Sequence, residues 1–308
     1  LPGQLCAVTA GVMRAEAARP EGWFDLIHSH YWLSGQVGWL SSERWNVPLV
    51  HSMHTMAKVK NLDLAQGDTP EPEMRVIGEE QVVAAADRLI ANTDDEAHQL
   101  VDLYDANPDA VDVVHPGVDL AVFTPGSRAE ARRRRGLAAD AIVLLFVGRI
   151  QPLKGPDVAI RALAALGDAR AQLVIVGGAS GTEGDVETMR AHALVDELGL
   201  HDRVRFVEPQ PHHILSTYYR AADVVVAPSR SESFGLVALE AAACGIPVVA
   251  SAVGGLLSLV DDGRTGRLIE GRDPGDYAAA IAGILGDDAV RTRMSLAAVE
   301  RARRYTWS

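Results

Sequence analysis

One stretch of sequence decides the fold of this chain: Val224-Val-Val-Ala-Pro-Ser-Arg-Ser-Glu-Ser-Phe-Gly-Leu-Val-Ala-Leu-Glu-Ala-Ala-Ala-Cys-Gly-Ile-Pro-Val-Val-Ala-Ser251. Two apolar runs, Val224–Ala227 and Pro247–Ser251, flank a helical pattern over Phe234–Cys244 that ends at Gly245. Apolar β-branched runs without polar alternation are typical of parallel strands that are covered on both faces. The stretch therefore predicts a strand–helix–strand unit of an α/β sheet.

The same alternation of apolar runs and helical patterns continues through almost all of the 308 residues. Further expected strands are Phe24–His28, Pro48–Ser52, Arg88–Asn92, Val111–Val114, Ile142–Val147, Gln172–Val176 and Val204–Phe206. Further expected helices are Glu71–Ala86, Asp94–Leu103, Arg128–Leu137, Pro156–Leu166, Asp185–Leu198 and Ile214–Ala221, with closing helices between Leu268 and Thr306.

The segment from Pro116 to Ser127 is rich in Pro, Gly and Asp and is typical of a linker. It predicts two domains, residues 1–120 and residues 121–308, each a doubly wound Rossmann-like α/β sheet. Ligands of such sheets bind at the carboxyl ends of the strands. The two domains are expected to face each other across a cleft.

Composition excludes several classes of protein. Twenty-nine Lys and Arg against 41 Asp and Glu give a net charge of −12, which argues against a nucleic-acid binder. No apolar run approaches the ~20 residues of a membrane span. Cys6 and Cys244 lack metal-like spacing and are expected to be reduced core residues of a cytoplasmic protein. The run Arg132–Arg135 is expected to form a solvated helix face.

Two carboxylates in the opening stretch suggest a ligand site. Glu232 precedes the helix and Glu240 lies within it, among apolar residues where a carboxylate is costly to bury unpaired. A loop leading into a helix N-terminus favours an anion, so the segment predicts a ligand with phosphate and hydroxyls. The alternatives are a solvated Glu232 and a Glu240 paired with a structural Arg.

A second candidate segment is Gly148-Arg-Ile-Gln-Pro-Leu-Lys-Gly155, which follows an expected strand. Arg149 offers a planar fork and Lys154 a point charge, and together they can clamp a diphosphate. The alternative is a pair of ordinary surface cations.

The first domain has a polar cluster after two expected strands, in the segments His28–Gly35 and His51–Asn61. Four histidines with Ser, Thr and Tyr suggest a pocket that recognises hydroxyls. A zinc site is disfavoured because no Cys or carboxylate completes the ligand set. Arg75 on the following helix could reach a phosphate here; the alternative is a surface salt bridge.

At these residues the chain resembles the retaining glycosyltransferases of family 4. The combination of Gly-Arg-x4-Lys-Gly at Gly148–Gly155 with Glu-x7-Glu at Glu232 and Glu240 is specific to that family. The resemblance implies the GT-B architecture of two facing Rossmann-like domains. The first-domain segments, with Thr69–Gln81, resemble the actinobacterial branch that transfers N-acetylglucosamine from UDP-GlcNAc to 1D-myo-inositol 3-phosphate in mycothiol biosynthesis.

The resemblance also implies roles for individual residues. The donor would be bound by Arg149 and Lys154 at the diphosphate, Glu232 at the sugar hydroxyls, Glu240 at the ribose and the backbone of Gln210 at uracil. In the family that last position is an Arg. The acceptor would be bound by Tyr31, Thr55 and Arg75. No cofactor is required for the chemistry, although a structural Mg²⁺ is implied at Tyr219, Arg220, Ala222 and Ile246, and a homodimer is a further expectation.

The chain departs from the family pattern at both ends. The family's first strand, its Gly-Gly loop, a catalytic-site His and an acceptor-phosphate Lys are expected before Leu1, and the last helix is expected to continue beyond Trp307. The sequence is thus interpreted as a fragment with an incomplete first domain that is itself inactive. The alternatives are a transferase with another acceptor (sucrose-phosphate-type or mannosyl transfer), a UDP-sugar epimerase, or a non-catalytic UDP-binding fragment.

Overall fold

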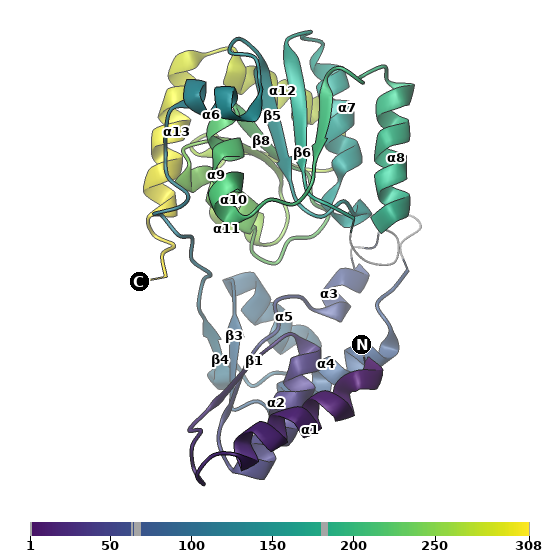
Figure 1. Ribbon diagram of the computed structural model, residues 1–308, viewed down its shortest axis with the longest axis vertical. Coiled ribbons are helices and arrows are strands. Elements are labelled where there is room, and N and C mark those ends of the chain that lie inside the picture. The colour runs from purple at the N-terminus through teal and green to yellow at the C-terminus, as the bar shows by residue number, and fades with distance from the viewer. Residues whose placement is uncertain (1, 63, 65–68, 180–183, 308) are drawn as a thin grey trace. The chain divides into compact units, whose positions relative to one another are not determined.

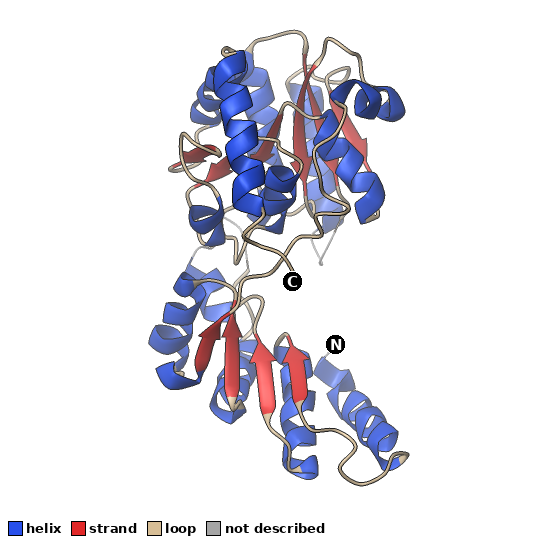
Figure 2. Ribbon diagram, turned by 90° about the vertical axis from the view of Figure 1, so that its left-hand side faces the viewer, coloured by secondary structure: helices blue, strands red, loops and turns tan. Residues whose placement is uncertain are grey.

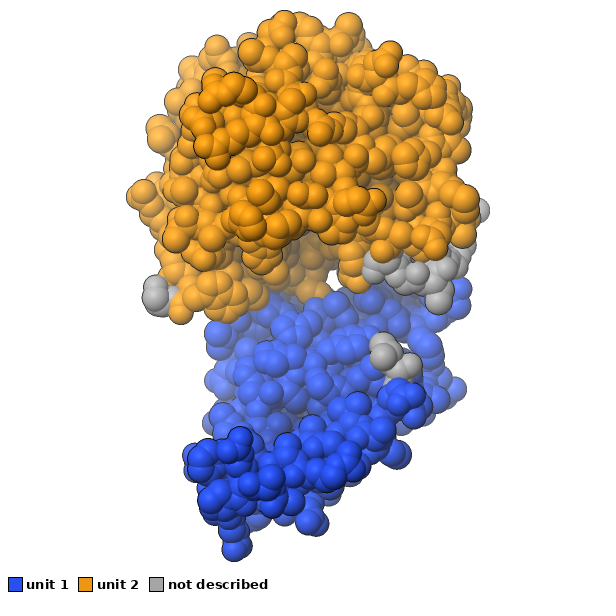
Figure 3. Space-filling model, viewed as in Figure 1, with its two compact units in different colours: residues 1–115 blue, residues 116–308 orange. Residues whose placement is uncertain are grey.

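A computed structural model describes residues 2–62, 64, 69–179 and 184–307 of the chain. The chain forms two compact units, residues 1–115 and 116–308 (Figure 3). This division falls before the expected one after residue 120. The Val118 N–H donates to the Tyr305 carbonyl at 3.0 Å, which ties the segment after Pro116 to the second unit.

The first unit holds a four-stranded sheet of order β1-β2-β3-β4, in which every pair is parallel (Figures 1 and 2). Its strands are β1 (Ile27–His30), β2 (Leu49–Ser52), β3 (Arg88–Ala91) and β4 (Val111–Val113). Its helices are α1 (Leu5–Ala17), α2 (Trp32–Trp45), α3 (Ala57–Leu62), α4 (Glu73–Ala85) and α5 (Asp94–Tyr104).

The second unit holds a six-stranded parallel sheet of order β10-β9-β8-β5-β6-β7. Its strands are β5 (Ile142–Val147), β6 (Ala171–Val176), β7 (Val204–Val207), β8 (Val224–Ala227), β9 (Val248–Ser251) and β10 (Gly266–Ile269). Its helices are α6 (Arg128–Arg135), α7 (Pro156–Leu166), α8 (Gly184–Glu197), α9 (His212–Ala221), α10 (Leu236–Ala243), α11 (Gly255–Leu259), α12 (Pro274–Leu285) and α13 (Asp288–Ala302).

The apolar run of β5 shows why this sheet is covered on both faces. Val143 and Leu145 belong to a core cluster shared with α9 and α10, whereas Leu144 and Phe146 belong to a second cluster shared with α7, α8 and α12. Successive side chains of a strand point to opposite faces, so each face needs its own apolar residues. The expected class, parallel α/β sheets in two Rossmann-like domains, is confirmed.

The chain order places a topological switch point beside β5. The chain runs from β5 outward to β6 and β7 and then returns to β8 on the other side of β5. The loops after β5 and β8 therefore diverge from adjacent strands, which is where open α/β sheets bind ligands. These loops carry the two candidate segments, Gly148–Gly155 and Pro228–Gly235.

Several sequence-based expectations were wrong in detail. Strand β1 begins at Ile27, three residues after the expected start at Phe24. The Phe24 ring instead stacks on that of Trp45, with the ring centres 5.2 Å apart. Helix α2 was not expected, because Gly35 and Gly38 weaken a helical pattern. A Cβ on Gly35 would lie 2.8 Å from His51, so glycine is required there. Strand β10 was not expected, and its last two residues, Leu268 and Ile269, lie where closing helices were expected.

Two further residues were misjudged. Cys6 is exposed on α1 and is not a core residue, while Cys244 is buried, which raises the pKa of its thiol to about 12. Arg132, expected on a solvated face, is buried and donates to the Asp223 carboxylate at 2.6 Å. Within the described ranges, the structure has no helix long and apolar enough to span a membrane.

Glycine lets the loops after β5 and β8 approach each other. Gly155 is the N-cap of α7 with φ +68°, and a Cβ added to it would lie 2.4 Å from the Pro228 carbonyl oxygen. Gly167 ends the same helix with φ +69°, and the nearest atom to its added Cβ is 4.0 Å away. The two positions thus share the left-handed backbone but differ in the space around them.

We expect Gly155→Ala to destabilise the second unit far more than Gly167→Ala. The control should cost about 1 kcal/mol for the left-handed backbone, and Gly155→Ala roughly 3 kcal/mol because the Pro228 backbone must also move. Urea midpoints of both variants, compared with the parent protein, measure the difference. Equal midpoints would show that the close approach is not required for stability.

Candidate functional site

The loop after β5 is held in place by backbone contacts with the loop after β6. Gly148 has φ +153°, and an added Cβ on Gly177 would lie 1.8 Å from the Gly148 carbonyl oxygen. The Ile150 N–H donates to the Gly178 carbonyl at 2.9 Å. Arg149, between these anchors, has an exposed side chain. The cation is therefore presented from a fixed backbone at the carboxyl end of the central strand.

Lys154 and Glu232 meet in the second unit. The Arg230 N–H donates to the Leu153 carbonyl at 2.8 Å, which joins the loops after β5 and β8. The Lys154 ammonium then donates to Glu232 Oε2 at 2.6 Å, and both side chains are one-fifth exposed. Glu232 is therefore not the solvated loop residue of the alternative interpretation. A cation and a carboxylate therefore lie side by side at this edge of the sheet.

The two glycines after β9 fix the backbone of Glu232. The Gly255 N–H donates to the Glu232 carbonyl at 2.9 Å. Gly254 has φ +45°, and an added Cβ would lie 2.1 Å from the same oxygen. No other residue type fits such an approach. Helix α10 begins at Leu236, two residues later than expected, because Gly235 takes a left-handed φ of +99° as its N-cap.

Glu240 is paired with a phenol and not with the Arg of the alternative interpretation. The Tyr219 hydroxyl, on α9, donates to Glu240 Oε2 at 2.6 Å. Burial raises the pKa of Glu240, while the Tyr219 hydrogen bond and the charge of His212 lower it. One carboxylate oxygen thus has a fixed donor, and the carboxylate can accept further hydroxyl protons such as those of a diol.

Gln210 lies in the loop before α9, where its side-chain amide donates to the Glu208 carbonyl at 2.8 Å.

The residues implied for Mg²⁺ lie at the other end of α9 and after α10. Backbone oxygens at a helix C-terminus lack the usual α-helical donors, although that of Tyr219 accepts from the Ala222 N–H at 3.0 Å. Hard cations prefer oxygen ligands. One such oxygen, that of Ala221, already accepts from the Arg132 guanidinium at 3.1 Å. The segment therefore offers carbonyl oxygens, which are the type of ligand that a hard cation binds.

Arg75 is the centre of the candidate site in the first unit. It is 4% exposed, so it is not part of a surface salt bridge. Its Nε donates to Glu79 Oε1 at 2.7 Å, and one terminal nitrogen donates to Thr55 Oγ1 at 2.8 Å. Burial lowers the pKa of Arg75, but the carboxylates of Glu79 and Glu71 outweigh it and raise the pKa.

Tyr31 and Thr55 lie with Arg75 at the carboxyl ends of β1 and β2. The Arg75 guanidinium carbon lies 5.2 Å from the centre of the Tyr31 ring. Tyr31 and His54 have φ of +71° and +62°, a backbone region that costs such residues about 1–3 kcal/mol. The structure therefore brings the three expected acceptor residues together, on strained backbone that is typical of functional loops.

Sequence reasoning missed the residues that hold Arg75. Glu79 is fully buried, and its Oε2 accepts from the Tyr104 hydroxyl at 2.5 Å and from the Ala57 N–H at 2.8 Å. The spacing of Arg75 and Glu79, four residues apart on one helix, is the signal that could have found the pair. Tyr104 is distant in sequence and left no such signal.

The histidines of β1 and β2 and of the segments that follow them form a cluster next to Arg75's site. His30 Nδ1 and His54 Nε2 are 2.8 Å apart, and His51 Nδ1 is 2.8 Å from Ser29 Oγ. Burial, followed by repulsion from His54, His30 and His28, lowers the pKa of His51 to about 3. Across the described ranges, no group of three or more His, Cys, Asp or Glu is arranged to hold a metal ion.

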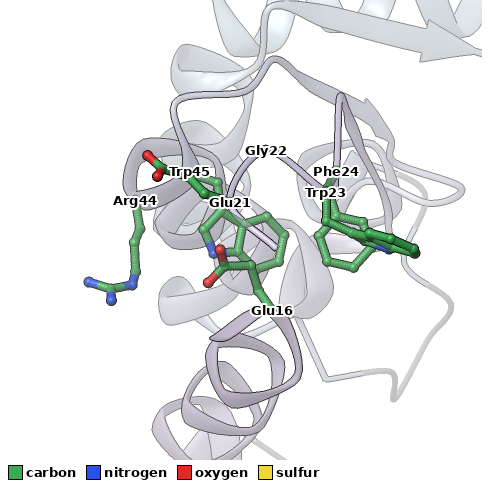
Figure 4. Close-up of a pocket in the computed structure, with 7 residues that line it drawn as sticks. All are labelled: Glu16, Glu21, Gly22, Trp23, Phe24, Arg44 and Trp45. Carbon is green, nitrogen blue, oxygen red and sulfur yellow. The ribbon is translucent and has the colours of Figure 1, made fainter. Parts of the chain in front are cut away.

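A cavity of about 270 Å³ lies elsewhere in the first unit (Figure 4). It is lined by Trp23 and Phe24, which precede β1, by Trp45 at the end of α2, and by Glu16, Glu21, Gly22 and Arg44. These residues lie toward the amino end of β1, whereas Tyr31 and Thr55 follow the carboxyl ends of β1 and β2. The cavity is therefore not part of the candidate site.

Comparison with known proteins identifies the family. The model of "Glycosyl transferases group 1" matches residues 127–301, and that of "Glycosyl transferase 4-like domain" matches residues 2–117. The chain belongs to the group 1 glycosyltransferases. These matches cover both units, so the expected family and the expected enzyme class, a hexosyltransferase, are confirmed.

Relatives and solved structures agree with this assignment. This glycosyltransferase is 59% identical to D-inositol 3-phosphate glycosyltransferase 2 of Catenulispora acidiphila, over its whole length and 73% of that protein. It is 57% identical to D-inositol 3-phosphate glycosyltransferase of Thermomonospora curvata, over its whole length and 74% of that protein. It superposes on sucrose-phosphate synthase from Thermosynechococcus elongatus with a TM-score of 0.91 at 34% identity, over 100% of this chain and 75% of that one. It superposes on Anabaena HepE in complex with UDP and glucose with a TM-score of 0.85 at 25% identity, over 99% of this chain and 78% of that one.

The histidine cluster predicts an acid-sensitive first unit in this glycosyltransferase. The pKa of His51 falls from 6.5 to about 3 on folding, so between these values the unfolded chain binds the proton more tightly and stability falls as pH falls. At pH 5 the loss should approach about 2 kcal/mol. Urea midpoints at pH 7 and pH 5 should therefore differ less in His51→Gln than in the parent protein.

The control is His201→Gln, which removes an exposed histidine that lies 3.2 Å from Asp196. This variant should keep the acid sensitivity of the parent protein. If His51→Gln kept it too, the buried histidine would not be its source.

Proposed function

We propose that the protein transfers N-acetylglucosamine from UDP-GlcNAc to 1D-myo-inositol 3-phosphate with retention of the anomeric configuration. The observation that carries the proposal is the buried Arg75, which is held against Thr55 and beneath Tyr31 in a protein whose relatives are named D-inositol 3-phosphate glycosyltransferases. The complexes of the structural neighbour HepE with UDP and with UDP-glucose support a nucleotide-sugar donor.

Acceptor binding is assigned to the first unit. An arginine fork suits phosphate because it offers parallel N–H donors. The Thr55 hydroxyl and the Tyr31 phenol can exchange hydrogen bonds with the phosphate or the ring hydroxyls of the acceptor. Since Glu79 fixes the Arg75 side chain, the fork does not have to be ordered when the acceptor binds.

Donor binding is assigned to the second unit. Arg149 and Lys154 bind the diphosphate, Glu232 accepts from the sugar hydroxyls and Glu240 from the ribose diol, with the Gln210 backbone at uracil. Lys154 already lies against Glu232, so one side chain can contact the leaving phosphate while its neighbour contacts the transferred sugar.

In the proposed reaction the bond between the anomeric carbon and the UDP oxygen breaks, and the acceptor oxygen bonds to that carbon from the same face. The acceptor hydroxyl gives its proton to an oxygen of the leaving phosphate. Arg149 and Lys154 offset the charge that grows on UDP, an electrostatic term worth several kcal/mol. Glu232 orients the sugar and forms no covalent bond with it.

A structural Mg²⁺ is a separate part of the proposal. Backbone oxygens of Tyr219, Arg220, Ala222 and Ile246 would hold it, as the donor type of this segment allows. The ion would brace the end of α9 against the loop after α10 and would supply no chemistry to the transfer. The residues that act on the substrates are those named above.

Product analysis tests the proposal. The full-length protein is incubated with UDP-GlcNAc and inositol 3-phosphate, and mass spectrometry and proton NMR identify the product and its anomeric configuration. A GlcNAc–inositol phosphate with the donor's configuration supports the proposal. Transfer only to a different sugar phosphate or to a lipid, interconversion of the UDP-sugar without an acceptor, or UDP binding without turnover would each reject it.

We predict that Lys154→Ala lowers turnover by roughly 10²–10³-fold, the cost of losing one donor to a developing charge. The matched control is Arg161→Ala, which removes an exposed cation from α7 and should leave turnover unchanged. Steady-state kcat for both variants is the measurement. A loss of less than about threefold for Lys154→Ala would rule out its role at the leaving group.

We predict that Arg75→Lys raises KM for inositol 3-phosphate about tenfold or more, and KM for UDP-GlcNAc less than about twofold. Lysine keeps a positive charge opposite the buried Glu79 but loses the fork. Removing the charge altogether would leave Glu79 unpaired and could unfold the unit. Equal changes in both KM values would reject Arg75 as an acceptor residue.

A further inference from the structure

Arg75 has almost no donor left for a ligand. Besides Glu79 at Nε, it donates through NH2 to the carbonyl and the hydroxyl of Thr55, at 3.1 and 2.8 Å, and through NH1 to Glu71 at 2.9 Å. A guanidinium has five N–H groups, so four are already in use. A phosphate that binds Arg75 with two hydrogen bonds must displace a partner that is now in place.

Glu71 is the partner that a phosphate can replace. Glu79 is buried, and Thr55 accepts from Arg75 through its backbone carbonyl as well as its hydroxyl. The Glu71 side chain, in contrast, is one-quarter exposed. The same oxygen, Glu71 Oε1, also accepts from the Lys60 ammonium at 2.8 Å. One carboxylate oxygen therefore bridges two cations, which is the arrangement that a phosphate oxygen would adopt.

The Glu71 side chain can leave without unfolding its surroundings. The Glu71 N–H donates to the Asn61 side chain at 2.8 Å, which anchors its backbone to α3. Only the side chain has to rotate. A phosphate monoester carries about −1.5 to −2 charges near pH 7 and three acceptor oxygens, so it interacts more strongly with Lys60 and Arg75 than one carboxylate does. A Glu71 that stayed in place would repel it.

We propose that Lys60 is a second cation for the acceptor phosphate and that Glu71 occupies the phosphate position until the acceptor displaces it. The proposal rests on the phosphorylated acceptor of the proposed function. It makes Glu71 a specificity residue, because an acceptor without phosphate cannot compete for the two cations. Lys60 and Glu71 have opposite effects on binding, although they form one ion pair.

The chain offers a matched control close by. Lys58 Nζ lies 2.7 Å from Glu80 Oε1, and this pair joins α3 to α4, whereas Lys60 pairs with Glu71 in the segment just before α4. Glu80 has no ion pair with Arg75. Glu80→Gln therefore removes the same charge and the same type of bridge as Glu71→Gln, but leaves the cations of the phosphate position as they are.

The experiment compares Glu71→Gln, Lys60→Gln and Glu80→Gln with the parent protein. The first readout is KM for inositol 3-phosphate with UDP-GlcNAc saturating. The second is the rise in melting temperature caused by inorganic phosphate, without donor or acceptor. We expect Glu71→Gln to lower KM roughly threefold to tenfold and to enlarge the phosphate shift. Lys60→Gln should raise KM about tenfold and reduce the shift, and Glu80→Gln should change neither.

Opposite signs for Glu71→Gln and Lys60→Gln separate the proposal from a structural role. If the pair only braced α3, both variants would weaken phosphate binding together, and that result would overturn the proposal. Equal behaviour of Glu71→Gln and Glu80→Gln would also overturn it. If the parent protein does not act on inositol phosphate, the proposed function fails, but the phosphate shift still decides whether Lys60 and Glu71 act as described.

Discussion

The close approach of backbone at the carboxyl ends of β5 and β8 is the constraint on which the second unit depends. Gly155 lies against the Pro228 carbonyl, and Gly254 lies against that of Glu232. These contacts have no room for a Cβ, so they fix the loops more rigidly than side-chain packing would. Lys154 and Glu232 can form a tight ion pair because the backbone on either side of them is already placed.

The first unit positions its cation by another route. Arg75 is held by the buried carboxylate of Glu79, which in turn accepts from Tyr104 and the backbone of Ala57. A buried ion pair costs desolvation and is stable only when its remaining hydrogen-bonding groups are satisfied. The network around Glu79 meets that condition. The other carboxylate partner of Arg75 is Glu71, which is more exposed and also pairs with Lys60.

How far the sequence predicts the structure varies from element to element. Apolar strands such as Ile142–Val147 and Val224–Ala227 were predicted to the residue, because both faces of a parallel strand must be apolar. Polar or glycine-containing elements were missed or shifted: β1 is His-Ser rich, β10 carries Arg267, and α2 contains Gly35 and Gly38. There, tertiary contacts override local pattern. The tyrosines that donate to Glu240 and to Glu79 from other elements, Tyr219 and Tyr104, were also missed, since hydrogen bonding across elements leaves no periodic signal.

The sequence by itself determined the class of fold, the positions of both candidate segments after strands, and the charges that they carry. It did so because strand pairing, glycine turns and ligand-binding loops each require particular residues at local spacing. Only the tertiary structure decided which charges are already paired. Lys154 meets Glu232, Tyr219 meets Glu240, and Arg75 is shared by Glu79, Thr55 and Glu71. The partners in all but the two short-range Arg75–Glu pairs are separated by 20 or more residues, so their meeting depends on packing and not on spacing.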